Sequence, residues 1–469
     1  MDVTDPSLFS ARELRRCYQS RELSPVEVVE STLRRIETVD PLLGAFVTVC
    51  ADRALEEAHR AERQFATSPE TASMQPLLGV PLSIKDMVAT KGIRTTMGSL
   101  TRKDWIPDFD PPVVERIKQS GAVLLGKTNT SEYGWKGDSG NRIVGPTRNP
   151  WSRERTAGGS SGGAAAALAA GLGPLALGAD GAGSVRIPAS FCGVVGLKPS
   201  FGLIPWYPSS GVPLFAHHGV LSRTVSDAAT FLDVLAGPDP RDPLSISERP
   251  DVFSSAIDSI DLRGLKIGWS PRLKDASVEP EVAELVASAV SVFTELGCTV
   301  EEVEPDFDDP YPILDVIWSV GHATRHRHDL EEVRDLLDPG LLPVIEAGLE
   351  RSGVDVGAAM FARSEYIENM RQFMASYDIL LTPTVPIEAF SAGADQPGSV
   401  AGRTTEYLSW TPFTYPFNIT GQPAVSVPCG CTLAGLPVGL QIVGQWRDDA
   451  QVLKVAAAFE VARPWPLMP

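Results

Sequence analysis

The sequence is poor in histidine, cysteine and positive charge. It contains six histidines and six cysteines among 469 residues, and 41 lysines and arginines stand against 59 aspartates and glutamates, for a formal net charge of −18. This charge argues against a nucleic-acid partner, because phosphate binding depends mostly on cationic side chains. It also argues against an anionic membrane surface. Cysteines this scarce fit a reducing compartment, and the tight spacing of Cys429 and Cys431 fits neither zinc nor a redox motif.

Long apolar runs are also missing. The N-terminus reads Met-Asp-Val-Thr-Asp and lacks the basic and apolar regions of a signal peptide. The most apolar stretch, 162–177, is interrupted by glycine and proline and is too short to span a bilayer. We therefore expect a cytoplasmic protein with no membrane partner.

Enough hydrophobic residues are present for a large core, at 43% against 21% charged residues. Periodicity predicts strands over 77–84, 122–125, 265–269, 298–304, 379–382, 424–427 and 438–443. Helices are predicted after a capping box at 24–27 and over 164–170, 226–235, 281–296 and 448–462. Strands that alternate with helices along the whole chain indicate an α/β fold. No repeat or clear linker divides it, so 237–250 is interpreted as a surface loop and 64–75 as a polar loop.

Two known sequence motifs occur in this chain, but the structural context that each one requires is not evident. The stretch 121–128 fits the phosphate-loop pattern G-x-x-x-x-G-K-T, but Ala-Val-Leu-Leu at the variable positions favours a buried strand. The stretch 158–162 fits G-x-S-x-G, the turn of a nucleophilic serine, centred on Ser160, and the next register centres on Ser161. That turn should follow a buried strand and have a partner histidine, and neither is evident. The patterns therefore favour neither nucleotide binding nor a Ser-His-Asp triad.

The histidines give no clear metal site. His322 and His326 share a helical face, and His328 follows, but no third ligand with suitable spacing is visible. A solvated helix rich in arginine and histidine is the favoured interpretation. His217 and His218 either line a pocket or form a loop pair with backbone hydrogen bonds, and we favour the loop pair. No metal or cofactor is expected.

Two serines in glycine-rich turns and one lysine carry the strongest chemical signal. They are Ser160, Ser184 and Lys85, and this set can perform acyl transfer without histidine or metal. Glycines beside Ser184 allow a sharp turn whose backbone N–H groups face a developing oxyanion. Taken singly, each residue has an ordinary interpretation. Ser160 would be a helix cap, Ser184 a serine in a tight turn, and Lys85 a surface or ion-paired lysine.

Taken together, the stretches around these residues resemble the amidase signature family. The resemblance covers essentially the full chain and is densest over about 77–202. The motifs that carry it are Gly79-Val-Pro-Leu-Ser-Ile-Lys85-Asp, Gly126-Lys-Thr-Asn-Thr-Ser-Glu132, Gly145-Pro-Thr-Arg-Asn-Pro150, Gly158-Gly-Ser160-Ser-Gly-Gly, Asp180-Gly-Ala-Gly-Ser184-Val-Arg186, Cys192-Gly-Val-Val-Gly-Leu-Lys-Pro199, Asn418-Ile-Thr-Gly-Gln-Pro and Gly435-Leu-Pro-Val-Gly-Leu-Gln-Ile-Val-Gly444.

The resemblance implies a Ser-cisSer-Lys triad. Ser184 would be the nucleophile that forms the acyl-enzyme, Ser160 the bridging serine after a cis peptide bond, and Lys85 the terminal base. The backbone N–H groups of the nucleophile turn would form the oxyanion hole, at Gly181, Ala182, Gly183 and Ser184. Asp180 and Arg186 would support the same turn.

The resemblance also implies an architecture. It is a single large α/β domain over residues 1–469, with a central mixed, twisted sheet flanked by helices on both sides. Much of the substrate pocket would come from about 300–415. The partner would be a small-molecule amide, with no cofactor, metal or nucleic acid, and a homodimer is left open.

Departures from the family pattern bear on the substrate. Family members often have Thr-Asp-Thr-Gly-Gly-Ser at the nucleophile turn, where this chain has Ala179-Asp-Gly-Ala-Gly-Ser184. The stretch 201–207 is more apolar than in the A subunit of glutamyl-tRNA(Gln) amidotransferase. We therefore expect hydrolysis of an apolar or aryl amide, with contacts from aromatic residues that include Trp206, Tyr207, Phe215, Trp135 and Trp318. The alternative interpretation of these five residues is that they are ordinary core aromatics. The alternatives are the glutaminase component of that amidotransferase, its A subunit, and a catalytically silent binding protein.

Overall fold

The computed structural model describes residues 5–250 and 252–466 as one α/β domain built on an 11-stranded sheet. Residues 1–4, which carry most of the acidic N-terminus discussed above, lie outside the described part. In order across the sheet, the strands are β1 (Phe46–Val49), β3 (Val123–Thr128), β2 (Pro81–Lys85), β6 (Leu175–Asp180), β8 (His217–Ser222), β7 (Val195–Lys198), β14 (Ala424–Cys431), β15 (Pro437–Gly444), β11 (Ile379–Pro383), β9 (Lys266–Trp269) and β10 (Thr299–Glu302).

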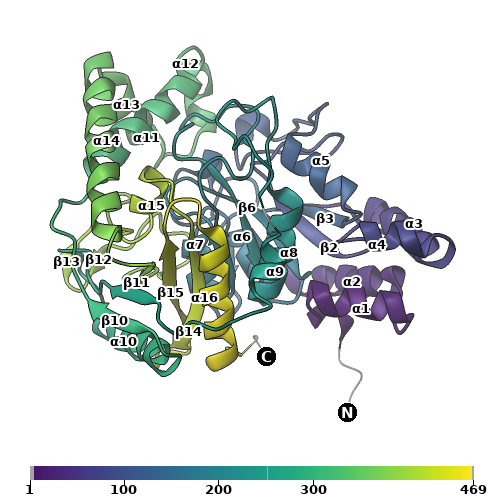
Figure 1. Ribbon diagram of the computed structural model, residues 1–469. Coiled ribbons are helices and arrows are strands. Elements are labelled where there is room, and N and C mark those ends of the chain that lie inside the picture. Colours follow the sequence, from purple (N-terminus) through teal and green to yellow (C-terminus); the bar gives the residue numbers. More distant parts are fainter. Residues whose placement is uncertain (1–4, 251, 467–469) are drawn as a thin grey trace.

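The sheet is mixed, and helices pack against it (Figure 1). Strands β3, β2 and β6 are parallel neighbours, whereas β8, β7, β14 and β15 pair antiparallel. The α-helices are α1 (Ala11–Ser20), α2 (Pro25–Leu43), α3 (Ala51–Thr67), α4 (Pro69–Met74), α5 (Pro112–Gln119), α6 (Gly162–Ala169), α7 (Arg186–Cys192), α8 (Val225–Leu235), α9 (Phe253–Ala256), α10 (Pro280–Glu295), α11 (Tyr311–His326), α12 (Leu330–Val333), α13 (Leu342–Glu350), α14 (Gly353–Met374), α15 (Pro416–Ile419) and α16 (Asp449–Ala462). Two short hairpins complete the fold, β4 (Arg148–Asn149) with β5 (Ser152–Thr156), and β12 (Ser399–Val400) with β13 (Arg403–Thr404).

Alternation along the strands divides the core between the two faces of the sheet. In β6, Leu175 and Leu177 belong to the cluster that also contains residues of α8, α10 and α16, whereas Ala176 belongs to the cluster of α6. Side chains that follow one another in a strand point to opposite faces. Small residues on the α6 side let the alanine-rich helix lie close to the sheet. The predicted α/β fold, with helices on both faces of a mixed sheet, is thereby confirmed.

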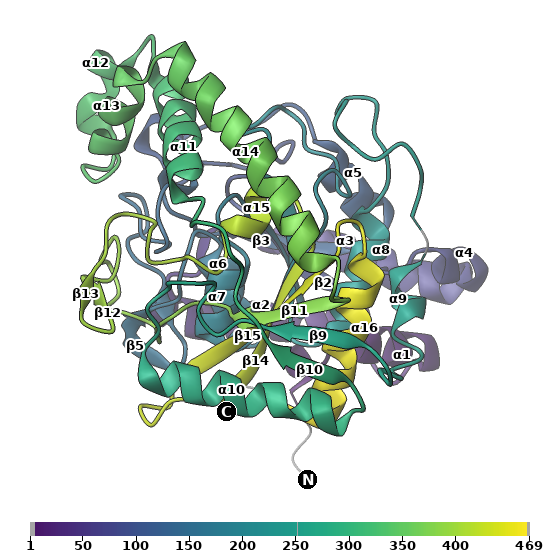
Figure 2. The same ribbon diagram turned by 60° about the vertical axis from the view of Figure 1, so that its left-hand side comes forward.

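Helices α11, α13 and α14 form a separate group beside the sheet. They pack mainly on one another and lie at the opposite side of the molecule from α1–α4 (Figure 1), and α14 crosses above β11 and β15 in the second view (Figure 2). The weak apolar periodicity of α14 explains why the sequence does not predict it, because its buried residues are only Ala359, Tyr366, Met370 and Met374.

The predicted polar loop over 64–75 is wrong. Helix α3 continues to Thr67, and α4 follows at once with Pro69 in its first turn. Ala61 and Ala72 are buried against Leu78, so a narrow stripe of alanine is enough to hold two otherwise polar helices on the domain. Alanine is the strongest helix former. The alanines of this stretch therefore outweigh the polar residues, which on their own indicate a loop.

No helix in the described residues is long and apolar enough to cross a bilayer.

Candidate active site

Two parallel strands bring Lys85 beside the turn that carries Ser184, which is called the nucleophile turn after the role that the sequence predicts for Ser184. Lys85 is the last residue of β2 and Asp180 the last of β6, and the strands pair with Leu82 opposite Leu175 and Ile84 opposite Leu177. The carboxyl ends of parallel neighbours lie at the same edge of a sheet. The turn that carries Ser184 therefore begins next to Lys85, although the two residues are far apart in the sequence.

The Lys85 ammonium group contacts three neutral oxygen atoms. Its Nζ lies 2.7 Å from Ser160 Oγ, 2.9 Å from Ser161 Oγ and 3.2 Å from the Ala179 carbonyl oxygen. The side chain is fully buried, and no carboxylate among the described residues forms an ion pair with it. A buried amine without a salt bridge is costly to keep charged.

Burial therefore lowers the pKa of Lys85 to about 7, and the carboxylate of Asp180 opposes this only in part. An ordinary lysine would be almost entirely protonated at neutral pH. Lys85 instead has a large uncharged fraction there. An uncharged amine at hydrogen-bonding distance from a hydroxyl can accept its proton.

Two other buried lysines have similar pKa values but different contacts. Burial lowers the pKa of Lys127 to about 8 and that of Lys198 to about 7. Lys127 donates to the Val88 carbonyl and to two threonine hydroxyls, and Lys198 donates to the carbonyl oxygens of Pro199 and Gln422. Neither of them contacts a serine. Of these three lysines, Lys85 is therefore the one that has both a lowered pKa and contacts with serine hydroxyls.

The turn before α6 holds Ser160 and Ser161 against Lys85. The Gly159–Ser160 peptide bond is cis, and Gly158 has a φ of +79°, in the region that favours glycine. Substitution at Gly159 would place a Cβ 2.5 Å from the Asp138 carbonyl carbon, so only glycine fits there.

Ser161 is the residue of the site that the sequence argument missed. Its Oγ contacts Lys85 Nζ and donates to the Ala179 carbonyl, 3.2 Å away, and its backbone N–H donates to the Ser184 carbonyl oxygen at 3.0 Å. Ser161 thus connects the lysine to the nucleophile turn. The sequence signal for Ser161 is the pair of adjacent serines between glycines, of which the family resemblance implies a role only for Ser160.

The nucleophile turn is fixed by the carboxylate of Asp180. Asp180 accepts hydrogen bonds from the N–H groups of Gly183 (2.7 Å) and Val185 (3.1 Å) and forms a paired contact with the Arg186 guanidinium at 3.0 Å. Burial alone would raise the pKa of Asp180, but Arg186 and the Asn418 amide outweigh it and hold the pKa well below its usual range. The turn is therefore held by a carboxylate that stays ionised.

Asp180 already engages one of the backbone donors that the sequence predicts for the oxyanion hole. The Gly183 N–H already donates to Asp180, whereas the N–H groups of Gly181, Ala182 and Ser184 have no partner among the described residues. Three free donors within one turn, beside a serine hydroxyl, suit an oxygen that gains negative charge.

Ser184 lies on the wall of the pocket that also contains Ser160 and Lys85. Its Oγ forms no hydrogen bond within the described residues, and the residue is 8% exposed, so it is open to the pocket. The structure thus joins Lys85 to Ser160 and places Ser184 in the same pocket without a Ser160–Ser184 hydrogen bond. Catalytic hydrogen bonds are often formed only when substrate is bound.

The rest of this pocket is mostly aromatic and apolar. Its further lining residues come from four segments of the chain and include Met87, Tyr133, Trp206, Val212, Ala216, Trp318, His322 and Arg325. Of the aromatic residues expected near substrate, Trp206 and Trp318 therefore line the pocket. The other three do not line it: Phe215 is buried, Tyr207 is exposed at the surface, and Trp135 stacks on Tyr407.

Trp318 lies directly on the nucleophile turn. A Cβ at Gly181 would come 2.8 Å from Cζ3 of Trp318 and 3.1 Å from its Cη2. The indole N–H donates to the Tyr407 hydroxyl at 2.8 Å, and the Tyr407 ring stacks on Trp135. Glycine at position 181 and the indole at 318 thus occupy complementary space.

The histidines do not form a metal site. Within the residues that the structure describes, no group of three or more histidine, cysteine, aspartate or glutamate side chains could hold a metal ion. His322 and His326 are buried on α11, so the predicted solvated helix is wrong. Burial lowers the pKa of His322 to about 3, which leaves a neutral imidazole in the pocket wall. His217 and His218 lie in β8 and not in a loop, although His217 Nδ1 does lie 2.7 Å from the Phe215 carbonyl oxygen.

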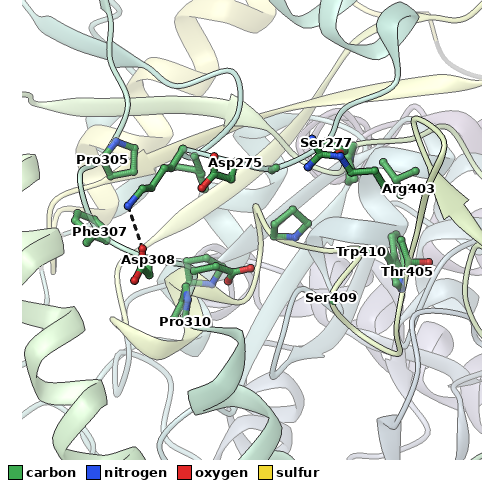
Figure 3. A pocket seen from close by; sticks show the side chains of 18 of the residues that line it. Asp275, Ser277, Pro305, Phe307, Asp308, Pro310, Arg403, Thr405, Ser409 and Trp410 are labelled. Carbon is green, nitrogen blue, oxygen red and sulfur yellow. Dashed lines mark hydrogen bonds and ion pairs between the residues drawn. The ribbon is translucent and has the colours of Figure 1, made fainter.

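A cavity of about 220 Å³, which is larger than the pocket of Ser184, lies elsewhere in the molecule (Figure 3). The two share no lining residue. The walls of the larger cavity include Phe307, Pro310 and Trp410, and an ion pair of Lys274 with Asp308 (3.0 Å) lies at its edge. The segment 410–416 lines this cavity and also contacts the nucleophile turn, where Thr414 Oγ1 donates to the Ala182 carbonyl oxygen at 2.8 Å.

Comparisons with known proteins agree over the whole chain. A family model described as Amidase matches residues 27–453. The acylamidase of Rhodococcus erythropolis is 41% identical over 462 residues, which cover 97% of this chain and 96% of that protein. The A subunit of glutamyl-tRNA(Gln) amidotransferase from Synechococcus sp. is 38% identical over 492 residues, which cover 98% of this chain and 97% of that protein. The crystal structure of a bacterial aryl acylamidase of the amidase signature enzymes family matches with a TM-score of 0.89 at 33% identity, covering 97% of this chain and 96% of that one.

Proposed function

The chain belongs to the amidase signature family, and we propose that Ser184, Ser160 and Lys85 are its catalytic residues. The protein is a hydrolase that acts on amide C–N bonds. The family and the reaction that the sequence motifs predict are thereby confirmed. The observation that supports these roles is the 2.7 Å contact between Ser160 and a buried lysine with a pKa of about 7.

The proposed reaction proceeds in two halves. Ser184 Oγ attacks the amide carbonyl carbon while its proton moves to Ser160 Oγ, and the proton of Ser160 moves to Lys85 Nζ. The carbonyl oxygen becomes an oxyanion that accepts hydrogen bonds from the free N–H groups of the nucleophile turn. The C–N bond then breaks, and the amine leaves with the proton that returns through Ser160. Water, deprotonated along the same route, hydrolyses the acyl-enzyme.

The reaction should become faster as pH rises through about 7. Lys85 accepts a proton only when it is uncharged, and its pKa of about 7 means that the uncharged fraction grows from about one tenth to about nine tenths across two pH units. We expect kcat/KM to rise in this range and then level off, as measured from initial rates between about pH 5.5 and 9.5. A kcat/KM that falls steeply above neutral pH in a folded protein would contradict a lysine base.

The pocket supports an uncharged substrate with an apolar or aromatic group. Trp206, Trp318 and Val212 supply apolar surface, and the basic lining residues are Lys85 and Arg325. Among the described lining residues the carboxylate is that of Asp180, which Arg186 already neutralises. The ammonium group of glutamine would find no counter-charge there, and burying it unpaired would be costly. The names of the acylamidase and aryl acylamidase relatives agree with this substrate class.

Comparing an anilide with glutamine tests the substrate class. We expect kcat/KM for a simple acyl anilide to exceed that for glutamine by at least about 100-fold, the equivalent of about 3 kcal/mol. Ammonia release from glutamine and aniline release from the anilide would be measured with the same preparation. A preference for glutamine, together with a stable complex with a tRNA-binding protein, would favour the amidotransferase instead.

A side chain at position 181 should disturb the pocket through Trp318. The Cβ of Gly181→Thr would collide with the indole ring, and overpacking of this kind costs about 1–3 kcal/mol. We expect kcat/KM for an anilide to fall about tenfold or more, with partial recovery in the double variant Gly181→Thr/Trp318→Leu. Gly357→Thr on α14 is the matched control, because nothing lies within 4 Å of its Cβ. Equal loss in the single and double variants would exclude this contact as the cause.

The location and assembly of the protein are proposals as well. Cys17, Cys192, Cys298 and Cys429 are buried as free thiols, and the structure contains no disulfide within its described residues. We infer a cytoplasmic location from these thiols. The homodimer left open by the sequence stays a prediction that sedimentation can test.

A further inference from the structure

A third pocket, of about 290 Å³, lies between α14, the segment 420–422 and Trp446. It shares no lining residue with the pocket of Ser184. Phe201 and Ile367 form apolar walls, and Trp446 is 55% exposed. A Cβ at Gly421 would come 2.9 Å from the Cβ of Phe201, so glycine leaves room for that side chain.

Two hydrogen-bond donors that line this pocket have no partner among the described residues. Gln422 and Gln445 use their amide groups in contacts with Gly444, Thr420, Met374 and Tyr377. In contrast, Arg363 Nε is buried without a hydrogen-bond partner in the described residues, and the Trp446 indole N–H has none there either. Two unpaired donors beside an apolar wall suit a ligand with an acceptor group.

The Arg363 guanidinium also lacks a counter-charge. It forms no ion pair within the described residues, and its central carbon lies 6.0 Å from the centre of the Phe215 ring. Burial lowers the pKa of Arg363, yet a guanidinium stays protonated at neutral pH. Arg371 at the edge of the pocket differs, because Glu368 neutralises it at 2.6 Å. A partly buried, unpaired cation is stabilised by an anion that it can bind with two hydrogen bonds.

We propose that this pocket binds a monocarboxylate with an aromatic or aliphatic body. The carboxylate accepts hydrogen bonds from Arg363 and from the Trp446 N–H, and the body lies against Phe201 and Ile367. Acids of this class are released when apolar amides are hydrolysed, but binding here does not depend on hydrolysis. The site therefore adds a ligand-binding function that is separate from the Ser184 pocket.

Calorimetric titration with 4-phenylbutyrate tests the proposal on the full chain carrying Ser184→Ala, so that the result is independent of catalysis. We expect saturable binding of one ligand per chain. Arg363→Gln should weaken it at least about tenfold, because a charge-assisted, two-point contact is lost. Trp446→Ala, at an exposed position that tolerates change, should weaken it as well. Arg263→Gln, at an exposed arginine paired with Asp261, is the matched control and should have no effect.

Several outcomes would overturn the proposal. One is the absence of saturable binding, and another is binding that survives both Arg363→Gln and Trp446→Ala. Equal affinity for the neutral alcohol 4-phenylbutan-1-ol would show that the charge plays no part. Loss of binding in Trp318→Ala alone would place the ligand in the Ser184 pocket. Conversion of a dimer to a monomer by Trp446→Ala, without ligand binding in the parent, would identify the pocket as an interface between copies.

Discussion

Lys85→Met is expected to lower kcat/KM for an amide by about 10³-fold or more while the protein remains folded. The substitution keeps most of the side-chain volume but removes the amine that contacts Ser160 and Ser161. Without it, the proton of Ser184 has no base to reach. Activity would be measured per folded molecule, with the folded fraction determined from thermal unfolding.

Lys127→Met is the matched control for this variant. Lys127 is equally buried and its pKa is lowered to about 8 by burial, but its contacts are a carbonyl and two threonine hydroxyls. We expect its folded fraction to fall and its activity per folded molecule to persist. A folded Lys85→Met protein with full activity would remove Lys85 from the mechanism.

Ser184→Ala is expected to have the largest effect, a loss of about 10⁶-fold in kcat, as removal of a hydrolase nucleophile produces elsewhere. No acyl-enzyme can form without its hydroxyl. Ser190→Ala on α7 is the matched control, because Ser190 is also buried but its Oγ has no hydrogen-bond partner in the described structure. We expect that control to keep near-normal rates for anilide hydrolysis. Substantial residual turnover in Ser184→Ala would assign the nucleophile to another residue.

Local sequence signals predicted much of the fold. The capping box at Ser24 and Glu27 does start α2, and the alanine-rich stretch does form α6 beside the sheet. The phosphate-loop pattern ends in β3 as a buried strand, as its apolar variable positions indicated. These elements are set by contacts within a few residues, which is why the sequence alone is sufficient.

The site could be predicted only in part, because its contacts join distant segments. Lys85 and Ser160 are 75 positions apart, so their spacing alone predicts no contact between them. The resemblance to a family is what indicated that they act together. Trp318 and Arg325 reach the pocket from α11, whose place follows from packing on α13 and α14. The engagement of the Gly183 N–H by Asp180 depends on the exact shape of one turn, which no pattern of residue types records.

The pH dependence of fluorophosphonate labelling, followed by peptide mapping, tests the proton relay most directly. The reagent reacts with an activated serine and requires no knowledge of the natural substrate. We expect a single adduct on Ser184, a labelling rate that rises through an apparent pKa near 7, and a slow, pH-independent rate in Lys85→Met. An adduct on a different serine, or an unchanged pH profile in Lys85→Met, would contradict it.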